Sequence, residues 1–188
     1  MNKKTRGFTL VELLIVIVVI AILAAITLVS YNGVQRRAHN TVTLSAAKNA
    51  LNVLTSYYTL NGQIFLSDLP PGFHGVCIGT IDSYPESSNL DAGECYPNFY
   101  ASAQLEAGLN SVGTLNLKPY EFDAGDDNYT RGIQYSFDGD AYMWYDLVGA
   151  DQDCELSGAT SPGGGPNETD CRINMTEFLG EAPIDYSY

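Results

Sequence analysis

The hydrophobic positions divide the chain into three parts, and the first part is almost entirely apolar. Residues 8–29 contain one acidic side chain and no basic one. As an α-helix, with a rise of about 1.5 Å per residue, this stretch is about 33 Å long. That length matches the hydrocarbon core of a membrane, which is about 30 Å thick. We therefore predict a membrane-spanning helix over residues 8–30.

The second part, residues 31–61, keeps a helical period but becomes amphipathic. Its apolar positions recur every three or four residues, which is typical of a helix with one buried face. This stripe consists of Leu44, Ala47, Leu51, Leu54 and Tyr58, and it is widened by Ala46, Ala50, Val53 and Tyr57. Asn61 and Gly62 are typical of a helix C-terminus. The pattern predicts one helix from about Thr9 to Leu60, with its second half packed on a sheet.

The third part, residues 62–188, has short apolar runs separated by turn residues, as expected for a globular head. Its clearest signal is a hairpin, because Ile133–Phe137 and Ala141–Leu147 alternate on either side of Asp-Gly-Asp. Residues 99–107 predict a short helical or irregular turn. The fold class is therefore α+β: a long N-terminal helix packed on a small antiparallel sheet, with disulfide-closed loops.

The aromatic residues of this hairpin have two interpretations. Tyr142, Trp144 and Tyr145 can stack on a helix or on cross-strand neighbours, which is the usual role of aromatic residues in strands. Alternatively, they contact a glycan or a host surface.

The charge is distributed unevenly along the chain. The net charge is −13, yet residues 61–188 contain three basic and 21 acidic side chains, or 3 − 21 = −18. Such an acidic head repels phosphate backbones, so we expect no direct nucleic-acid binding by it. Lys3, Lys4 and Arg6 precede the apolar stretch and predict that this end stays in the cytoplasm. The pair Arg36–Arg37 beyond the stretch weakens this orientation signal without reversing it.

Four cysteines follow the apolar stretch, and an even number fits two disulfides in an oxidising compartment. Three pairings are open. We favour Cys77–Cys95 and Cys154–Cys171, because each pair closes a short loop rich in turn residues. A zinc site is the weaker alternative, since no cysteine pair has the spacing of a zinc-binding motif.

Two acidic loops are candidates for calcium, because oxygen-rich loops suit a hard cation. The loop at residues 123–128 contains Asp123, Asp126 and Asp127, and the loop at residues 146–155 contains Asp151 and Asp153. Neither has EF-hand spacing, and solvated acidic turns are the commoner case, so we expect no required metal or cofactor. No serine-hydrolase, nucleotide-binding or zinc-protease motif occurs, so we expect no enzyme.

Glu12 is the anomaly in the apolar stretch. A carboxylate at the centre of a membrane helix costs about 2.5–3.5 kcal/mol. At the helix end it could simply reach the headgroup region. Alternatively, cleavage after Gly7 would give Phe8 a free amine, which a neighbouring helix could present to Glu12. Such a pair would fix the axial register between subunits while neutralising two charges.

The order Gly7-Phe8-Thr9-Leu10-Val11-Glu12 closely resembles the class III leader junction of type IV pilins and related pseudopilins. The resemblance covers about residues 1–37. It implies that residues 1–7 are a leader, that a prepilin peptidase cuts between Gly7 and Phe8, and that the Phe8 amine is then methylated. It also implies that Glu12 pairs with the terminus of a neighbouring subunit.

The resemblance implies the partners and the location as well. The chain would start in the cytoplasmic membrane and then join identical subunits in an extracellular helical filament, with the help of an assembly machinery. Many family members have a proline where this chain has Val29, and that residue is associated with local melting of the helix when the filament forms. Because Val29 is not a helix breaker, such melting is in doubt for this chain. Gly33 is the favoured kink site, because glycine has the largest helix penalty nearby.

Three alternatives to a major pilin are open. A minor pilin or a type II secretion pseudopilin would share the first 37 residues. An ordinary secretory signal is disfavoured by Glu12 and by the length of the apolar run. A single-span membrane protein displaying a binding domain would keep an intact Met1 and form no filaments.

Overall fold

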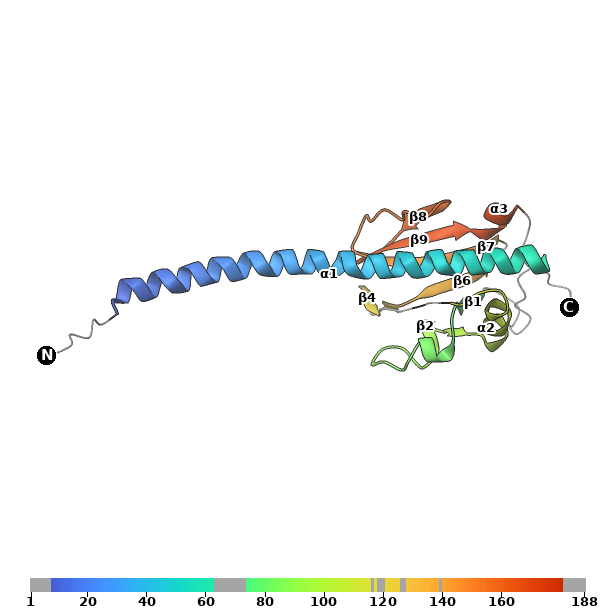
Figure 1. Ribbon diagram of the computed structural model, residues 1–188, viewed down its shortest axis with the longest axis horizontal. Helices are drawn as coiled ribbons and strands as arrows, with labels where there is room; N and C mark the ends of the chain where they lie inside the picture. The colour runs from blue at the N-terminus through green and yellow to red at the C-terminus, as the bar shows by residue number, and fades with distance from the viewer. Residues whose placement is uncertain are drawn as a thin grey trace. The chain divides into compact units, whose positions relative to one another are not determined.

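The computed structural model (Figure 1) describes residues 8–62, 74–115, 117, 121–125, 128–138 and 140–180. The chain forms two compact units that divide between Ala38 and His39, and each is considered by itself. Gly7, Asp126 and Asp127 lie outside the described residues.

Helix α1 spans Leu10–Asn61, so both predicted ends are correct to within one residue. The helix ends at Gly62, which has φ +75° and donates its N–H to the carbonyl of Tyr58 at 2.7 Å. A left-handed residue of this kind satisfies a carbonyl of the last turn and stops the helix. Helix α1 continues through Gly33, because glycine, unlike proline, retains its N–H for the helical hydrogen bond. A kink of the helix at this residue stays a prediction.

The second unit contains a seven-stranded sheet and a separate two-stranded ribbon. The sheet strands are β1 (His74–Cys77), β2 (Glu94–Tyr96), β3 (Phe99–Ala101), β6 (Ile133–Asp138), β7 (Asp140–Val148), β8 (Ala159–Gly163) and β9 (Glu168–Asn174). Their order is β2-β3-β1-β6-β7-β9-β8. The ribbon consists of β4 (Phe122–Gly125) and β5 (Asn128–Thr130), and the short helices are η1 (Ile81–Ser83), α2 (Ala103–Asn110) and α3 (Met175–Leu179).

The sheet is antiparallel as predicted, except that β1 and β3 pair in parallel. The predicted hairpin is confirmed as β6 and β7, with the pair Asp138 and Asp140 at its turn. Residues 99–107, expected to form a short helical or irregular turn, form strand β3 followed by the start of helix α2, so the helical expectation is correct for the second half of this range. The C-terminal arm contains β8, β9 and α3.

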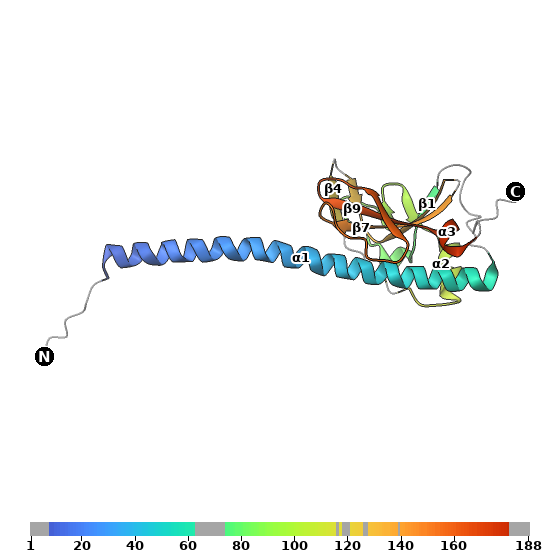
Figure 2. The same cartoon turned by 90° about the horizontal axis from the view of Figure 1, so that it is seen from above.

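The core lies between the second half of α1 and one face of the sheet (Figures 1 and 2). The predicted helix stripe is confirmed, since Ala47, Ala50 and Leu54 are fully buried and Leu44, Tyr57 and Tyr58 pack at its margin. From the sheet, alternate residues of β6, β7 and β9 point into this core. They include Ile133, Tyr135, Ala141, Met143, Tyr145, Leu147, Cys171 and Ile173. The other face of the sheet is left for polar and aromatic side chains.

Two disulfides close loops in the second unit. Cys77 is bonded to Cys95, and Cys154 is bonded to Cys171, with sequence separations of 18 and 17 residues. These are the two pairs that the loop lengths favoured, and no cysteine remains for a zinc site.

Candidate functional site

The first feature of functional interest is the apolar surface of the first unit. Every side chain from Phe8 to Thr27 is exposed, including Leu10 at 78% and Ile20 at 59%. Within the described residues, α1 is the one helix that is long and apolar enough to cross a membrane. Exposure of this many aliphatic side chains to water is strongly unfavourable, so the surface must be covered by lipid or by other protein.

Glu12 and Thr9 form a reciprocal cap at the start of this helix. The backbone N–H of Thr9 and its hydroxyl donate to the same oxygen of Glu12, Oε2, at 2.8 and 2.7 Å. In return, the N–H of Glu12 donates to the Thr9 hydroxyl oxygen at 3.2 Å. This capping box satisfies donors that the first helical turn leaves without a partner.

Sequence analysis missed this role of Thr9. A Thr followed three residues later by Glu and then by an apolar run is the standard signal for a capping box, and it could have been found. The cap also changes the interpretation of Glu12, because the carboxylate already has hydrogen-bond partners within its own chain. The contacts come from Thr9 and not from Phe8, whose side chain is 76% exposed.

Three of the acidic residues proposed for calcium, Asp123, Asp151 and Asp153, lie within the described part of the chain. Asp151 and Asp153 are exposed, while Asp123 lies in strand β4 instead of a loop. Asp146, the first residue of the second candidate loop, lies within β7. Among the described residues, no three acidic, histidine or cysteine side chains are placed to hold a metal ion.

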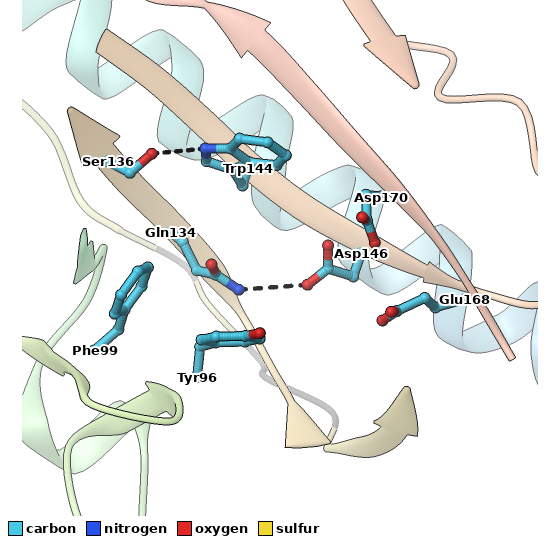
Figure 3. A pocket seen from close by; sticks show the side chains of 8 residues that line it. All are labelled: Tyr96, Phe99, Gln134, Ser136, Trp144, Asp146, Glu168 and Asp170. Carbon is cyan, nitrogen blue, oxygen red and sulfur yellow. Dashed lines mark hydrogen bonds between the residues drawn. The ribbon is translucent and has the colours of Figure 1, made fainter. Parts of the chain in front are cut away.

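The hairpin aromatics are divided between the two faces of the sheet. Tyr145 is fully buried against α1, and its hydroxyl donates to the carbonyl of Cys154. A contact of Tyr145 with an external partner is therefore wrong, because strand alternation turns it inward. Tyr142 and Trp144 lie on the outer face, where the Arg172 guanidinium sits 5.0 and 5.5 Å from their ring centroids. Trp144 also borders a groove on this face (Figure 3).

Comparison with known proteins identifies the family. Residues 2–28 match the family model described as the prokaryotic N-terminal methylation motif, a range that includes Gly7, Phe8 and Glu12. The type IV wide pilus major component of Thermus thermophilus is 37% identical over 119 residues, which cover 60% of this chain and 91% of that relative. The chain belongs to the type IV pilins.

Two further relatives show where this pilin resembles others. A fimbrial protein of Pseudomonas aeruginosa is 31% identical over 115 residues, covering 61% of this chain and 67% of the relative. A type IV major pilin of Neisseria gonorrhoeae is 39% identical over 72 residues, covering 38% of this chain and 33% of the relative. The chain thus matches only about a third of the length of the Neisseria pilins. No solved structure gives a significant match.

Proposed function

We propose that this pilin is the structural subunit that polymerises through its N-terminal helix into an extracellular filament. The filament would serve adhesion, surface motility or DNA uptake, and the chain itself would have no enzymatic activity. The observation that carries the proposal is the exposed apolar surface of residues 8–27, in which Glu12 is the one charged side chain. Lipid covers this surface before assembly, and the helices of neighbouring subunits cover it afterwards.

Processing precedes assembly in this proposal. A prepilin peptidase removes residues 1–7, the new amine of Phe8 is methylated, and the pilus assembly machinery lifts the subunit out of the cytoplasmic membrane. Because lipid is as apolar as the filament interior, packing alone supplies little driving force for this transfer. The transfer therefore depends on the machinery and on a specific contact that selects the register.

The geometry of Glu12 supports a dual role for its two carboxylate oxygens. Both Thr9 donors go to Oε2, and no described residue donates to Oε1. Oε2 can therefore keep the helix cap while Oε1 accepts a hydrogen bond from the Phe8 amine of a neighbouring subunit. Charge-assisted hydrogen bonds of this kind are about twice as strong as neutral ones, and more so in apolar surroundings.

The proposal is tested by comparing three variants for membrane insertion and filament yield in cells with the native assembly system. Glu12→Gln keeps the shape and a cap acceptor but removes the charge, and it should insert normally while filament yield falls at least tenfold. Thr9→Val removes the cap but keeps the carboxylate, so its filament yield should stay within about twofold of the parent. Glu12→Asp shortens the reach and should give an intermediate yield.

Mass spectrometry of the purified filament supplies the second arm. The subunit should begin at Phe8 and carry one N-methyl group. Filaments whose subunits retain Met1, or a Glu12→Gln variant that assembles as well as the parent, would exclude the proposed pairing. A membrane-anchored binding domain, the alternative from another class, predicts an intact Met1 and no filaments. A minor pilin or pseudopilin predicts the same processing but a filament in which this chain is a trace component.

A further inference from the structure

The outer face of the sheet, opposite α1, contains a groove of about 350 Å³. Eight residues line it: Tyr96, Phe99, Gln134, Ser136, Trp144, Asp146, Glu168 and Asp170. This volume is at the lower end of the range of small-ligand sites in proteins. Figure 3 shows Tyr96 and Phe99 on one side of the groove, Glu168 and Asp170 on the other, and Gln134 and Asp146 between them.

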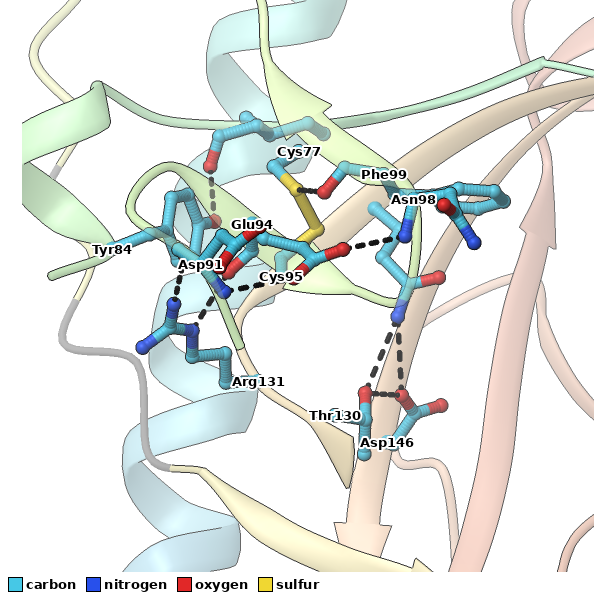
Figure 4. Close-up of a disulfide and its surroundings, with 12 residues drawn as sticks. Cys77, Tyr84, Asp91, Glu94, Cys95, Asn98, Phe99, Thr130, Arg131 and Asp146 are labelled. Atoms are coloured by element: carbon cyan, nitrogen blue, oxygen red, sulfur yellow. Dashed lines mark hydrogen bonds between the residues drawn. A yellow bond between two sulfur atoms is a disulfide. The ribbon is translucent and has the colours of Figure 1, made fainter. Parts of the chain in front are cut away.

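One wall of the groove is aromatic and rigidly held. The rings of Tyr96 and Phe99 are 5.4 Å apart and tilted by 55° to each other. They belong to β2 and β3, which the Cys77–Cys95 disulfide ties to β1 (Figure 4). The Phe99 ring fills the space above Gly75, where a Cβ atom would overlap it. A ring fixed in this way presents a ready-made apolar surface.

The floor of the groove contains the one tryptophan of the chain, Trp144. Its indole N–H donates to the Ser136 hydroxyl at 2.7 Å, which fixes the ring plane. The guanidinium of Arg172 lies over the same ring, 5.5 Å from its centroid. The ring is therefore already used in one cation–π contact, and it also lines the groove.

The opposite wall is acidic. Asp146 and Asp170 face each other directly in the register of β7 and β9, and Glu168 lies on the same face of β9. Oδ2 of Asp146 accepts hydrogen bonds from the Thr130 hydroxyl at 2.5 Å and the Gln134 amide at 3.3 Å. Within the described residues, no cation lies within ion-pair distance of Asp146 or Asp170. Among the described side chains, these two carboxyl groups are thus held together without a countercharge.

We propose that this groove binds a protonated amine on a short aliphatic stem, such as a lysine side chain or a free diamine. The stem would lie against the rings of Tyr96, Phe99 and Trp144, and the ammonium would contact the carboxylates of Asp146 and Asp170. A neutral glycan would use the rings and hydroxyl partners, but it would leave the two carboxylates without a countercharge. All residues of the site belong to the second unit.

The proposal also predicts that the affinity for the amine depends on pH. Burial, together with the charge of Asp170, raises the pKa of Asp146 to about 7, and burial also raises the pKa of Asp170. An ammonium that pairs with the Asp146 carboxylate must displace the proton that this group holds below its pKa, so the affinity for the amine should increase between pH 6 and pH 8, by up to about tenfold per pH unit. Among the described residues, the other charged groups on this face are Glu168 on β9, the Arg172 guanidinium over Trp144, and Asp140 beside Tyr142.

The experiment uses the full chain in uncharged detergent micelles and follows the fluorescence of Trp144. Nα-acetyl-lysine methylamide and 1,5-diaminopentane are the probes, and they distinguish a side-chain amine from a free diamine. The norleucine analogue, which has a similar stem without the ammonium, is the neutral control, and N-acetylgalactosamine represents a glycan. We expect saturable binding of at least one amine, at least tenfold tighter than that of the norleucine analogue.

Variants distinguish amine binding in the groove from long-range electrostatic attraction to the acidic head. Asp170→Asn should weaken amine binding at least tenfold, and Phe99→Ala should weaken it several-fold. Asp153→Asn removes the same charge from an exposed loop and should change the affinity by less than twofold. Near-ultraviolet circular dichroism confirms that each variant remains folded.

Several results would overturn the proposal: equal binding of the norleucine analogue, tighter binding of the sugar, or an unchanged affinity in Asp170→Asn. An equal loss in Asp153→Asn would reduce the effect to long-range attraction. None of these outcomes bears on whether Glu12 directs filament assembly, so the two proposals fail independently.

Discussion

Arg131 shows how one side chain organises a region that has little regular structure. It is 5% exposed and donates to three backbone carbonyls, those of Glu94 and Pro85 at 2.7 Å and of Asp91 at 3.0 Å. It also forms an ion pair with Glu121 at 3.5 Å (Figure 4 shows its place beside the disulfide). Its planar fork therefore connects two positions of the loop between β1 and β2, and the first residue of β2, to the rest of the head.

Replacing Arg131 with lysine should be strongly destabilising although the charge is kept. A single ammonium cannot reach three carbonyls in the same geometry, so at least one buried acceptor loses its donor, and a charge-assisted hydrogen bond contributes about 1.5–3 kcal/mol. We expect a loss of about 2–4 kcal/mol in the free energy of unfolding, measured by urea denaturation. Arg172→Lys is the control, because Arg172 contacts two ring faces and should cost less than about 1 kcal/mol.

Asp146 makes the stability of the head depend on pH. Its pKa in the folded chain is about 7, mainly because of burial, whereas an exposed aspartate titrates near pH 4. The folded state therefore holds a proton that the unfolded state has released, and this group's contribution to stability falls as the pH rises from about 4 to about 7.

The variant Asp146→Asn removes this titration while keeping an oxygen that accepts from Thr130 and Gln134. At pH 4 the variant and the parent should have similar melting temperatures, and at pH 8 the variant should be more stable, by at most about 4 kcal/mol. Thermal unfolding followed at both pH values checks this. A constant difference between the two proteins across this range would show that Asp146 keeps its ordinary pKa.

At the scale of elements, the two disulfides close loops of similar length, but they attach strands that are paired to their neighbours over different lengths. Strand β3 pairs with β1 over only two residues, Val76↔Tyr100 and Cys77↔Ala101. In contrast, β9 pairs with β7 over the seven positions from Tyr142 to Val148. The Cys77–Cys95 bond is therefore a main attachment of β2 and β3 to the rest of the sheet. The Cys154–Cys171 bond, in contrast, reinforces β9, which is already well paired.

Removing each disulfide should therefore have different local consequences. Each pair of Cys→Ser substitutions should cost about 3 kcal/mol through the freedom gained by the unfolded chain. Hydrogen exchange should accelerate sharply in β2 and β3 when Cys77 and Cys95 are replaced, while β9 should stay protected when Cys154 and Cys171 are replaced. Equal acceleration in both regions would mean that strand pairing does not decide local stability here.

The same contrast explains which elements the sequence could predict. Helix α1 and the β6–β7 hairpin have strong local signals, a 3.6-residue period and an Asp-Gly turn. Strand β9 also alternates, at Thr169, Cys171 and Ile173, although we did not predict it from the sequence. Strands β1, β2 and β3 are three or four residues long and are held by pairing and by a disulfide, so nothing local marks them.

The candidate sites also differ in whether the sequence alone can predict them. Glu12 stands out because a charge in an apolar run is visible in the sequence alone, and its partner Thr9 follows from a known local pattern. The groove could not be predicted. Phe99, Trp144 and Asp170 come from three strands, and the strand order that brings them together depends on long-range pairing.

For the whole molecule, the separation of buried residues along the chain predicts that the head folds without the membrane helix. Among the described residues, every buried hydrophobic side chain belongs to the second unit, and the first is Ala46. A polar anchor near the start of this unit is Asn40, whose side-chain amide donates to the carbonyl of Val148 at 3.2 Å and accepts from the N–H of Val148 at 2.8 Å. A chain that begins at Gln35 therefore keeps the entire core and this anchor, and it loses the exposed apolar surface.

This shortened chain should be monomeric in water without detergent, contain both disulfides and unfold in one cooperative transition. Its melting temperature should lie within a few degrees of that of the full chain in uncharged micelles, because residues 8–27 bury nothing in the head. Asn40→Ala in the shortened chain should lower its stability by about 1–3 kcal/mol, since it leaves two polar groups of β7 without partners. Sedimentation and calorimetry measure both effects. A shortened chain that aggregates or unfolds without cooperativity would show that the head depends on residues before Gln35, and that its fold and the membrane helix are not separable.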